Sequence, residues 1–125
     1  LSNMCEEEYN EGNKLIAEFM GLEKNDFGYW VNKDYLFGAQ LKLFDFELKF
    51  HSSWDWLMPV VEKIEKDMDM WIRIERDYIF VCRFNDYSGI ISSSNTFTHN
   101  KGKIYGVWLA VVEFIKWYNS CQKEK

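Results

Sequence analysis

Apolar side chains recur at helical spacing in three segments of the chain. The first segment begins at Asn10 or Asn13 and ends before Gly21, since glycine readily adopts the left-handed conformation that closes a helix. Its apolar side chains share one face: Leu15, Ile16, Phe19 and Met20. We therefore expect an amphipathic helix that packs against the rest of the fold.

The second helix is expected from about Ser53 to Asp67. Ser52 and Asp55 have the spacing of a capping box, in which side chains satisfy the first backbone N–H groups of a helix. Pro59 either kinks the first turns or is itself the start of the regular helix. Spacings of three and four define the expected buried stripe: Trp54, Leu57, Val61, Ile64 and Met68.

The third helix is expected from about Lys103 to Asn119. Its apolar stripe is broad and consists of Ile104, Val107, Trp108, Val111, Ile115 and Tyr118. A stripe of this width predicts a helix that lies against a sheet.

Alternation of apolar and polar residues predicts the strands. The clearest alternation places four residues on one buried face: Phe44, Phe46, Leu48 and Phe50. An antiparallel pair is expected on either side of Arg76 and Asp77. In its second strand one face consists of Tyr78, Phe80 and Cys82, and Phe80 is expected to point inward.

Two polar stretches are interpreted as connections. Residues 27–36 predict a hairpin that turns at Asn32, Lys33 and Asp34. A short strand is expected between Gly89 and Ser94, and the rest of residues 85–102 is interpreted as a loop that is a candidate functional segment.

These elements predict an α+β fold, in which one antiparallel sheet of about four or five strands packs with three helices. We expect helices on both faces of the sheet, in a layered α/β/α sandwich. No linker, repeat or low-complexity tract divides the sequence, so residues 1–125 are expected to form a single domain.

Aromatic residues are frequent, with 6 Trp, 7 Tyr and 10 Phe making up 18% of the chain. The predicted stripes account for some of them, such as Phe50 and Trp108. Trp54 and Trp56 cannot share one face of a helix, and Trp117 lies on the opposite side of the last helix from Trp108. The residues without a place on the stripes either pack beneath loops or bind a partner protein: Trp56, Trp117, Tyr29, Trp30 and Tyr35.

The chain has 15 basic and 20 acidic residues, a net charge of -5. Such acidity repels phosphate and disfavours broad nucleic-acid binding. An alternative site for single-stranded nucleic acid is a sheet surface with Arg73, Arg76 and Arg83, beside Trp71. The acidic residues near the first helix suit either the helix dipole or a basic partner: Glu6, Glu7, Glu8 and Glu11.

Cys5, Cys82 and Cys121 are far apart and lack the paired spacing of zinc ligands or of a disulfide framework. This usage favours a reducing, cytoplasmic setting. The apolar run from Val107 to Val112 is too short for a membrane helix, so no membrane partner is expected.

The sequence contains no clear catalytic constellation. His51, Ser52 and Asp55 are neighbours at a strand-to-helix junction, where capping explains the serine and aspartate better than a triad does. His51 and His99 lack metal-ligand spacing, and the glycines form no nucleotide-binding motif. An anion-binding corner remains a weak alternative at His99, Lys101 and Lys103. We expect a non-enzymatic protein with no metal and no cofactor.

Three segments, one in each predicted helix, stand out as blocks: NKLIAEFMG at 13–21, SWDWLMPVVEKIE at 53–65 and VVEFIKWYN at 111–119. In this order they resemble the phage ABA-sandwich domain family, and the central block is the most specific. The family comprises small proteins of phages and prophages, notably of Bacteroidetes, and its name describes a helix, sheet, helix arrangement. The resemblance implies a phage origin and this layered fold, and it transfers no catalytic residue.

These observations lead to the hypothesis of a phage- or prophage-encoded accessory protein that acts by stoichiometric protein binding. In its most concrete form, the protein inhibits a host defence effector of the CRISPR or restriction type. This form rests on analogy with other small phage proteins and not on any residue. Two alternatives stay open, a single-stranded nucleic-acid-binding accessory protein and a small enzyme of unknown reaction. A homodimer built on the surplus aromatic residues is also open.

Overall fold

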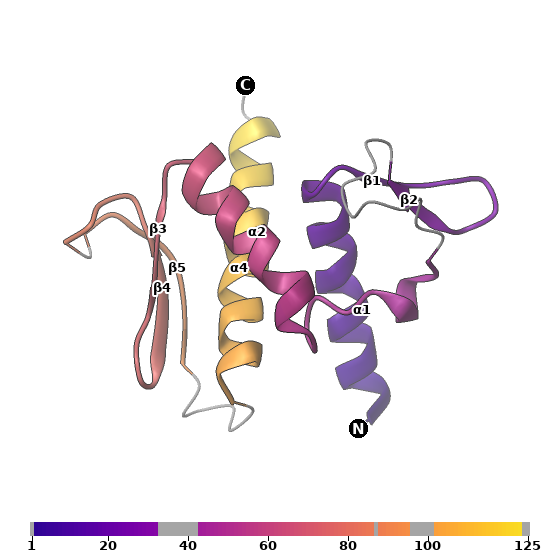
Figure 1. The fold of residues 1–125 in the computed structure, drawn as a ribbon, viewed down its shortest axis with the longest axis horizontal. Helices are drawn as coiled ribbons and strands as arrows, with labels where there is room; N and C mark the ends of the chain where they lie inside the picture. The colour runs from indigo at the N-terminus through magenta and orange to yellow at the C-terminus, as the bar shows by residue number, and fades with distance from the viewer. Residues whose placement is uncertain (1, 33–42, 87, 96–101, 124–125) are drawn as a thin grey trace. The chain divides into compact units, whose positions relative to one another are not determined.

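The structure is a computed structural model that describes residues 2–32, 43–86, 88–95 and 102–123 (Figure 1). Over these residues there are three α-helices and five strands, and the strands form two antiparallel sheets of two and three strands. The predicted α+β class is confirmed. The prediction of one sheet at the centre of an α/β/α sandwich is wrong, because the strands divide between two sheets.

The contacts of the chain divide into two compact units, Leu1–Lys49 (unit 1) and Phe50–Lys125 (unit 2). Unit 1 consists of α1 (Ser2–Phe19), β1 (Leu22–Lys24), β2 (Trp30–Asn32) and the short 3-10 helix η1 (Asp45–Glu47). Unit 2 consists of α2 (Trp54–Asp67), β3 (Trp71–Ile74), β4 (Tyr78–Cys82), β5 (Ile90–Asn95) and α4 (Gly102–Lys123). The expected single domain stays a prediction.

Helix α1 ends where the sequence predicts and begins earlier. Gly21 has a φ of 88° and donates its N–H to the carbonyl of Glu18 at 3.1 Å, which closes the helix. The early start follows from residues 2–10, which contain three glutamates and no helix breaker. Asn13 is buried in this helix and satisfied, because its amide donates to the carbonyl of Leu48 at 3.1 Å.

The hairpin of unit 1 turns earlier than predicted. β1 and β2 pair antiparallel, with Lys24 opposite Trp30, so the connection is residues 25–29. Asn32, expected in the turn, is the last residue of β2. The other expected turn residues, Lys33 and Asp34, lie outside the described residues.

The segment from Phe44 to Phe50, predicted as the clearest strand, is not a strand. The chain turns through η1, where the Phe44 N–H donates to the Glu47 carboxylate and the Glu47 N–H donates to the Phe44 carbonyl, both at 3.0 Å. Leu48 and Phe50 are buried as expected, but Phe44 is 40% exposed and Phe46 is 74% exposed. A period of two does not apply to a chain that turns, so the predicted inward face is wrong for both residues.

The sheet of unit 2 has the order β3-β4-β5, with both neighbouring pairs antiparallel. The predicted pair around Arg76 and Asp77 and the predicted strand near Gly89 to Ser94 are confirmed. α4 packs on β4 and β5, and α2 packs on α4 and β3. Figure 1 shows both helices on one side of this sheet, so the prediction of helices on both faces is wrong for unit 2. In the described ranges, no helix is long and apolar enough to cross a membrane.

Helix α2 starts at the predicted place without the predicted cap. Ser53 is the N-cap residue, yet its side chain makes no capping hydrogen bond. Its carbonyl accepts the N–H groups of Trp56 and Leu57 at 3.1 and 3.0 Å, so the helix begins before Pro59. The buried stripe consists of Leu57, Val60, Val61 and Ile64. The predicted stripe is therefore wrong at Trp54, which is 41% exposed, and at Met68, which is half-buried.

The inward face of β4 is the reverse of the predicted one. Ile79 and Val81 are fully buried, whereas Tyr78 is 49% exposed and Phe80 is half-buried. All five residues of β4 are apolar, so alternation could not select a face. Cys82 is buried at a register shift that follows Val81.

Two buried serines connect the sheet of unit 2 to α4. The hydroxyl of Ser92 donates to the carbonyl of Ala110 at 2.8 Å, and the hydroxyl of Ser94 donates to the carbonyl of Gly106 at 2.6 Å. These carbonyls are one helical turn apart, so the serines hold α4 along the strand direction.

Replacing Ser94 with alanine is expected to lower the free energy of unfolding by about 1 kcal/mol, because the buried hydrogen bond to Gly106 is lost. Urea denaturation measures the change. Ser93→Ala, on the exposed side of the same strand, is the matched control and is expected to change stability by less than about 0.5 kcal/mol. Equal losses in the two variants would contradict a role for the buried hydroxyl.

Candidate functional site

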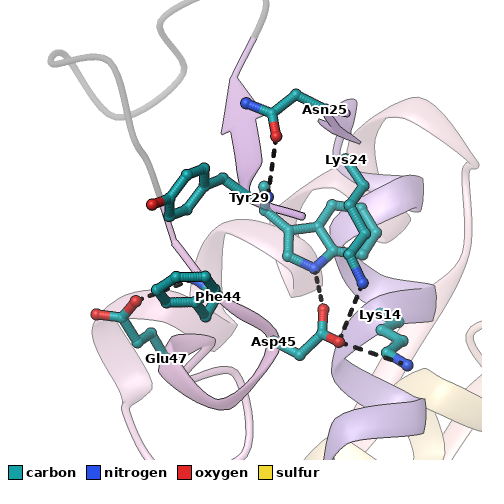
Figure 2. Close-up of polar contacts among 8 residues, drawn as sticks. Lys14, Lys24, Asn25, Tyr29, Phe44, Asp45 and Glu47 are labelled. Carbon is teal, nitrogen blue, oxygen red and sulfur yellow. Dashed lines mark hydrogen bonds and ion pairs between the residues drawn. The ribbon is translucent and has the colours of Figure 1, made fainter. Parts of the chain in front are cut away.

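The carboxylate of Asp45 collects polar contacts from three other elements of unit 1 (Figure 2). Its Oδ1 accepts the indole N–H of Trp30 at 2.6 Å. Its Oδ2 lies 3.1 Å from Nζ of Lys24 and 3.6 Å from Nζ of Lys14. These residues come from β2, β1 and α1, so one carboxylate on η1 cross-links the unit. We call the four residues the Asp45 network.

The surroundings of Asp45 change its pKa in opposing directions. Burial would raise the pKa, but the hydrogen bonds from Trp30 and Lys24 and the charges of Lys14 and Lys24 outweigh it and hold the pKa below its usual value. Asp45 is therefore ionised at neutral pH with its lone pairs engaged. This state suits a structural anchor better than a proton-transfer group.

Two hydrogen-bonded turns flank the Asp45 network. In the β1–β2 turn, Oδ1 of Asn25 accepts the N–H groups of Phe27 and Tyr29, both at 3.0 Å, and Gly28 has a φ of +87°. In the η1 turn, backbone hydrogen bonds between Leu43 and Trp30 place the segment beside β2. Both turns are thus fixed by local hydrogen bonds.

These turns bring three aromatic side chains together. The ring centroids of Tyr29 and Phe44 are 4.6 Å apart, and those of Phe44 and Phe46 are 5.7 Å apart with the rings nearly parallel. Phe44 and Phe46 are both exposed, while Tyr29 is half-buried. We call these three residues the aromatic cluster.

The three residues of unit 1 that the sequence predicts to bind a partner differ in their surroundings. Tyr29 belongs to the aromatic cluster. Trp30 is only 3% exposed and anchors Asp45, so the expectation that it offers a surface is wrong. Tyr35 lies outside the described residues.

The two residues of unit 2 that the sequence predicts to bind a partner, Trp56 and Trp117, lie on different helices. Trp56 is half-buried with its ring edge-on to Phe50 at 5.1 Å, and its neighbour Trp54 is the exposed member of the pair. Trp117 is half-buried in a groove of about 290 Å³, where it lies beside Phe114. The groove is lined by Met68, Met70, Arg83, Phe114, Trp117, Tyr118, Cys121 and Gln122.

The arginines of the nucleic-acid alternative do not form one patch. The guanidinium of Arg73 lies 5.7 Å from the ring centroid of Trp71, in the sheet. The guanidinium of Arg83 lies 5.2 Å from the ring centroid of Trp117, on α4. Arg76 is exposed in the β3–β4 turn, at the other end of these strands.

The other residues considered for catalysis or metal binding form no reactive site within the described ranges. Burial lowers the pKa of His51, whose ring lies edge-on to Trp108 at 6.5 Å, so the imidazole is mainly neutral at pH 7. Ser52 and Asp55 are exposed. Cys82 is a buried free thiol and burial raises its pKa, which makes it unreactive. No group of three metal-ligating side chains occurs within the described ranges.

The anion-binding corner cannot be assembled from the described residues. His99 and Lys101 lie outside them. Lys103 is exposed and donates to the carbonyl of Glu75 at 3.1 Å, so it joins the start of α4 to the β3–β4 turn.

A comparison of this chain with known protein families, with curated proteins and with solved structures finds no match. The resemblance to the phage ABA-sandwich domain family therefore stays a prediction.

The sequence does not reveal Phe44 and Phe46 as exposed residues of the site, because their alternation with Asp45 and Glu47 predicts that they lie in the core. One signal was present, since a glutamate three residues after Phe44 has the spacing with which a side chain closes a tight turn.

Proposed function

We propose that this protein is a phage- or prophage-encoded accessory protein that acts by stoichiometric protein binding through the aromatic cluster. The observation that supports this most is Phe46, which is 74% exposed and stacked on Phe44 in a turn held by hydrogen bonds. Exposed aromatic rings in contact with one another are typical of binding hot spots.

The rigidity of the turns favours binding. Ordering a flexible side chain or loop at an interface opposes association, and a surface that is already ordered avoids that loss. The Asp45 network and the Asn25 turn hold the backbone on both sides of the cluster before any partner arrives. Asp45 therefore serves binding indirectly, by positioning Phe44 and Phe46.

The charge of unit 1 indicates the partner's chemistry. Residues 1–49 contain ten acidic and five basic residues, and the glutamates of the first turns of α1 are exposed: Glu6, Glu7, Glu8 and Glu11. We expect a partner with an apolar pocket for the rings and a basic rim, whose association slows as salt is added. The function proposed is non-enzymatic.

Inhibition of a host defence effector is the narrower form of this proposal. It is supported by the resemblance of the three helical blocks to phage proteins. Expression of the chain in hosts that carry a CRISPR or a restriction system, followed by phage challenge, tests it. Restored plaque formation supports inhibition, and unchanged protection counts against this narrower form.

The double variant Phe44→Ala with Phe46→Ala is expected to weaken binding to a captured partner at least tenfold, since two hot-spot rings contribute about 1 kcal/mol or more each. The partner is first isolated with the full chain from a phage-host lysate, and the affinity is then measured by titration calorimetry. Light scattering of the chain alone checks whether the partner is a second copy.

Phe27→Ala is the matched control for that experiment. Phe27 is 82% exposed in the same unit but is not in the aromatic cluster, so its loss is expected to leave affinity nearly unchanged. Equal weakening by the control, or no weakening by the double variant, would refute the assignment of the cluster.

A further inference from the structure

The face of the three-stranded sheet that points away from α4 is a second surface, in unit 2. Strand register defines it, since Phe80 on β4 lies opposite Arg73 on β3 and Ser93 on β5. Opposed residues share a face, and the next residue, Ile79, is buried toward the helices. We call this surface the outer sheet face, and it comprises Trp71, Arg73, Glu75, Tyr78, Phe80 and Ser93, together with the buried Cys82 opposite Trp71.

Three aromatic rings lie on the outer sheet face. Trp71 is 44% exposed and Tyr78 is 49% exposed, while Phe80 is half-buried. The rings of Tyr78 and Phe80 are nearly parallel, with 12° between their planes and 6.0 Å between their centroids. In the described part of unit 2, the helices lie on the other side of the sheet (Figure 1). Exposed rings on a sheet surface are platforms on which unpaired bases stack.

Charge differs between the two units. Residues 50–125 contain ten acidic and ten basic residues, so the net charge of -5 of the chain belongs to residues 1–49. The chain's three arginines all lie between Arg73 and Arg83. Unit 2 therefore has no acidic surplus to repel phosphate, although the whole chain does.

One of these arginines lies beside the rings, and a second is exposed in the adjoining turn. The Arg73 guanidinium lies over Trp71 and donates to the carbonyl of Asn85 at 2.7 Å, which fixes its position on the outer sheet face. Arg76 is exposed in the turn just before Tyr78. Arginine is well suited to this task because its planar group both stacks on aromatic rings and pairs with phosphate oxygens.

We propose that the outer sheet face binds single-stranded nucleic acid, with bases stacked on Trp71, Tyr78 and Phe80 and phosphates paired with Arg73 and Arg76. A duplex does not fit this surface, because its bases are stacked on one another and closed to the rings. An acidic peptide would use the arginines but would gain little from parallel rings. This binding does not depend on the function proposed for the aromatic cluster.

The test is fluorescence anisotropy of the full chain with labelled oligothymidine and oligouridine of about 12 nucleotides, at about 50 mM salt. The double variant Tyr78→Leu with Phe80→Leu keeps apolar strand residues and removes the rings. It is expected to bind at least about tenfold more weakly than the wild type, because two stacking platforms are lost. The matched control is Phe44→Leu with Phe46→Leu in unit 1, which is expected to bind like the wild type.

Salt and competition complete the test. With two arginine–phosphate contacts, the logarithm of the association constant is expected to fall with the logarithm of salt concentration at a slope of about -1.4. An unlabelled duplex of the same length is expected not to compete. The proposal is overturned by absence of oligonucleotide binding at low salt, by unchanged binding in the leucine variant, or by equal competition from the duplex. If the variant Tyr78→Leu with Phe80→Leu binds the oligonucleotides like the wild type but no longer captures a protein from the lysate, the outer sheet face binds protein and the proposal fails.

Discussion

Replacing Trp108 with alanine is expected to lower the free energy of unfolding by about 3–5 kcal/mol, because the change leaves a cavity in the core of unit 2. Trp108 is 1% exposed and is among the largest fully buried side chains of the described chain. Its ring lies 5.8 Å from that of Tyr105 and 6.5 Å from that of His51. Urea denaturation followed by circular dichroism measures the loss.

Trp117→Ala is the matched control, on the same helix and with the same change in volume. Trp117 is half-buried at the edge of the groove, where solvent can occupy the space that the ring leaves. We expect a loss of about 1 kcal/mol. A loss as large as that of Trp108→Ala would contradict this difference in burial and show that Trp117 contributes as much to the core as Trp108.

The helices could be predicted because local spacing and packing agree in them. Leu57 and Ile64 on α2, and Val111 and Ile115 on α4, fall on predicted stripes and are fully buried. Each position follows from a period of 3.6 residues, which needs no knowledge of distant partners. The same reasoning could not find the start of α1, because its first turns carry no apolar stripe.

The strands show where local pattern stops being informative. β4 is apolar at every position, so the choice of face depends on its partners, and Ser92 and Ser94 of β5 reach inward to the carbonyls of α4. In the segment that contains η1, Asp45 is drawn to Trp30 and Lys24, which are 15 and 21 residues away. These long-range polar contacts override the alternation that suggested a strand.

The candidate site could be predicted only in part from the sequence, because it also depends on contacts between residues that are distant in sequence. Tyr29 could be selected because it had no place on a stripe, but its contact with Phe44 joins two turns that are separate in sequence. Net charge was also a poor guide, since it averages the acidic residues 1–49 with the neutral residues 50–125. Only the division of the contacts into two units assigns the acidity to one of them.

Replacing Asp45 with alanine is expected to lower the free energy of unfolding by about 2–3 kcal/mol, because the buried indole N–H of Trp30 loses its acceptor and two lysines lose their counter-charge. Asp45→Asn keeps an acceptor for Trp30 and is expected to lose about half as much. Both values come from urea denaturation at pH 7. Equal losses in the two variants would mean that only the negative charge matters.

The pH dependence of the same variants tests the assignment of charge to Asp45. The folded-state pKa of Asp45 lies below its usual value of 3.8, so its stabilisation is complete above that value and disappears as the pH falls through the folded-state pKa. The stability gap between the wild type and Asp45→Asn is therefore expected to be constant from about pH 7 to 5 and to shrink below about pH 4. Protonation of His51 destabilises both proteins alike and cancels in this difference. A gap that stays constant into strong acid would show that hydrogen-bond geometry, and not the ionised carboxylate, holds the turns of unit 1 together.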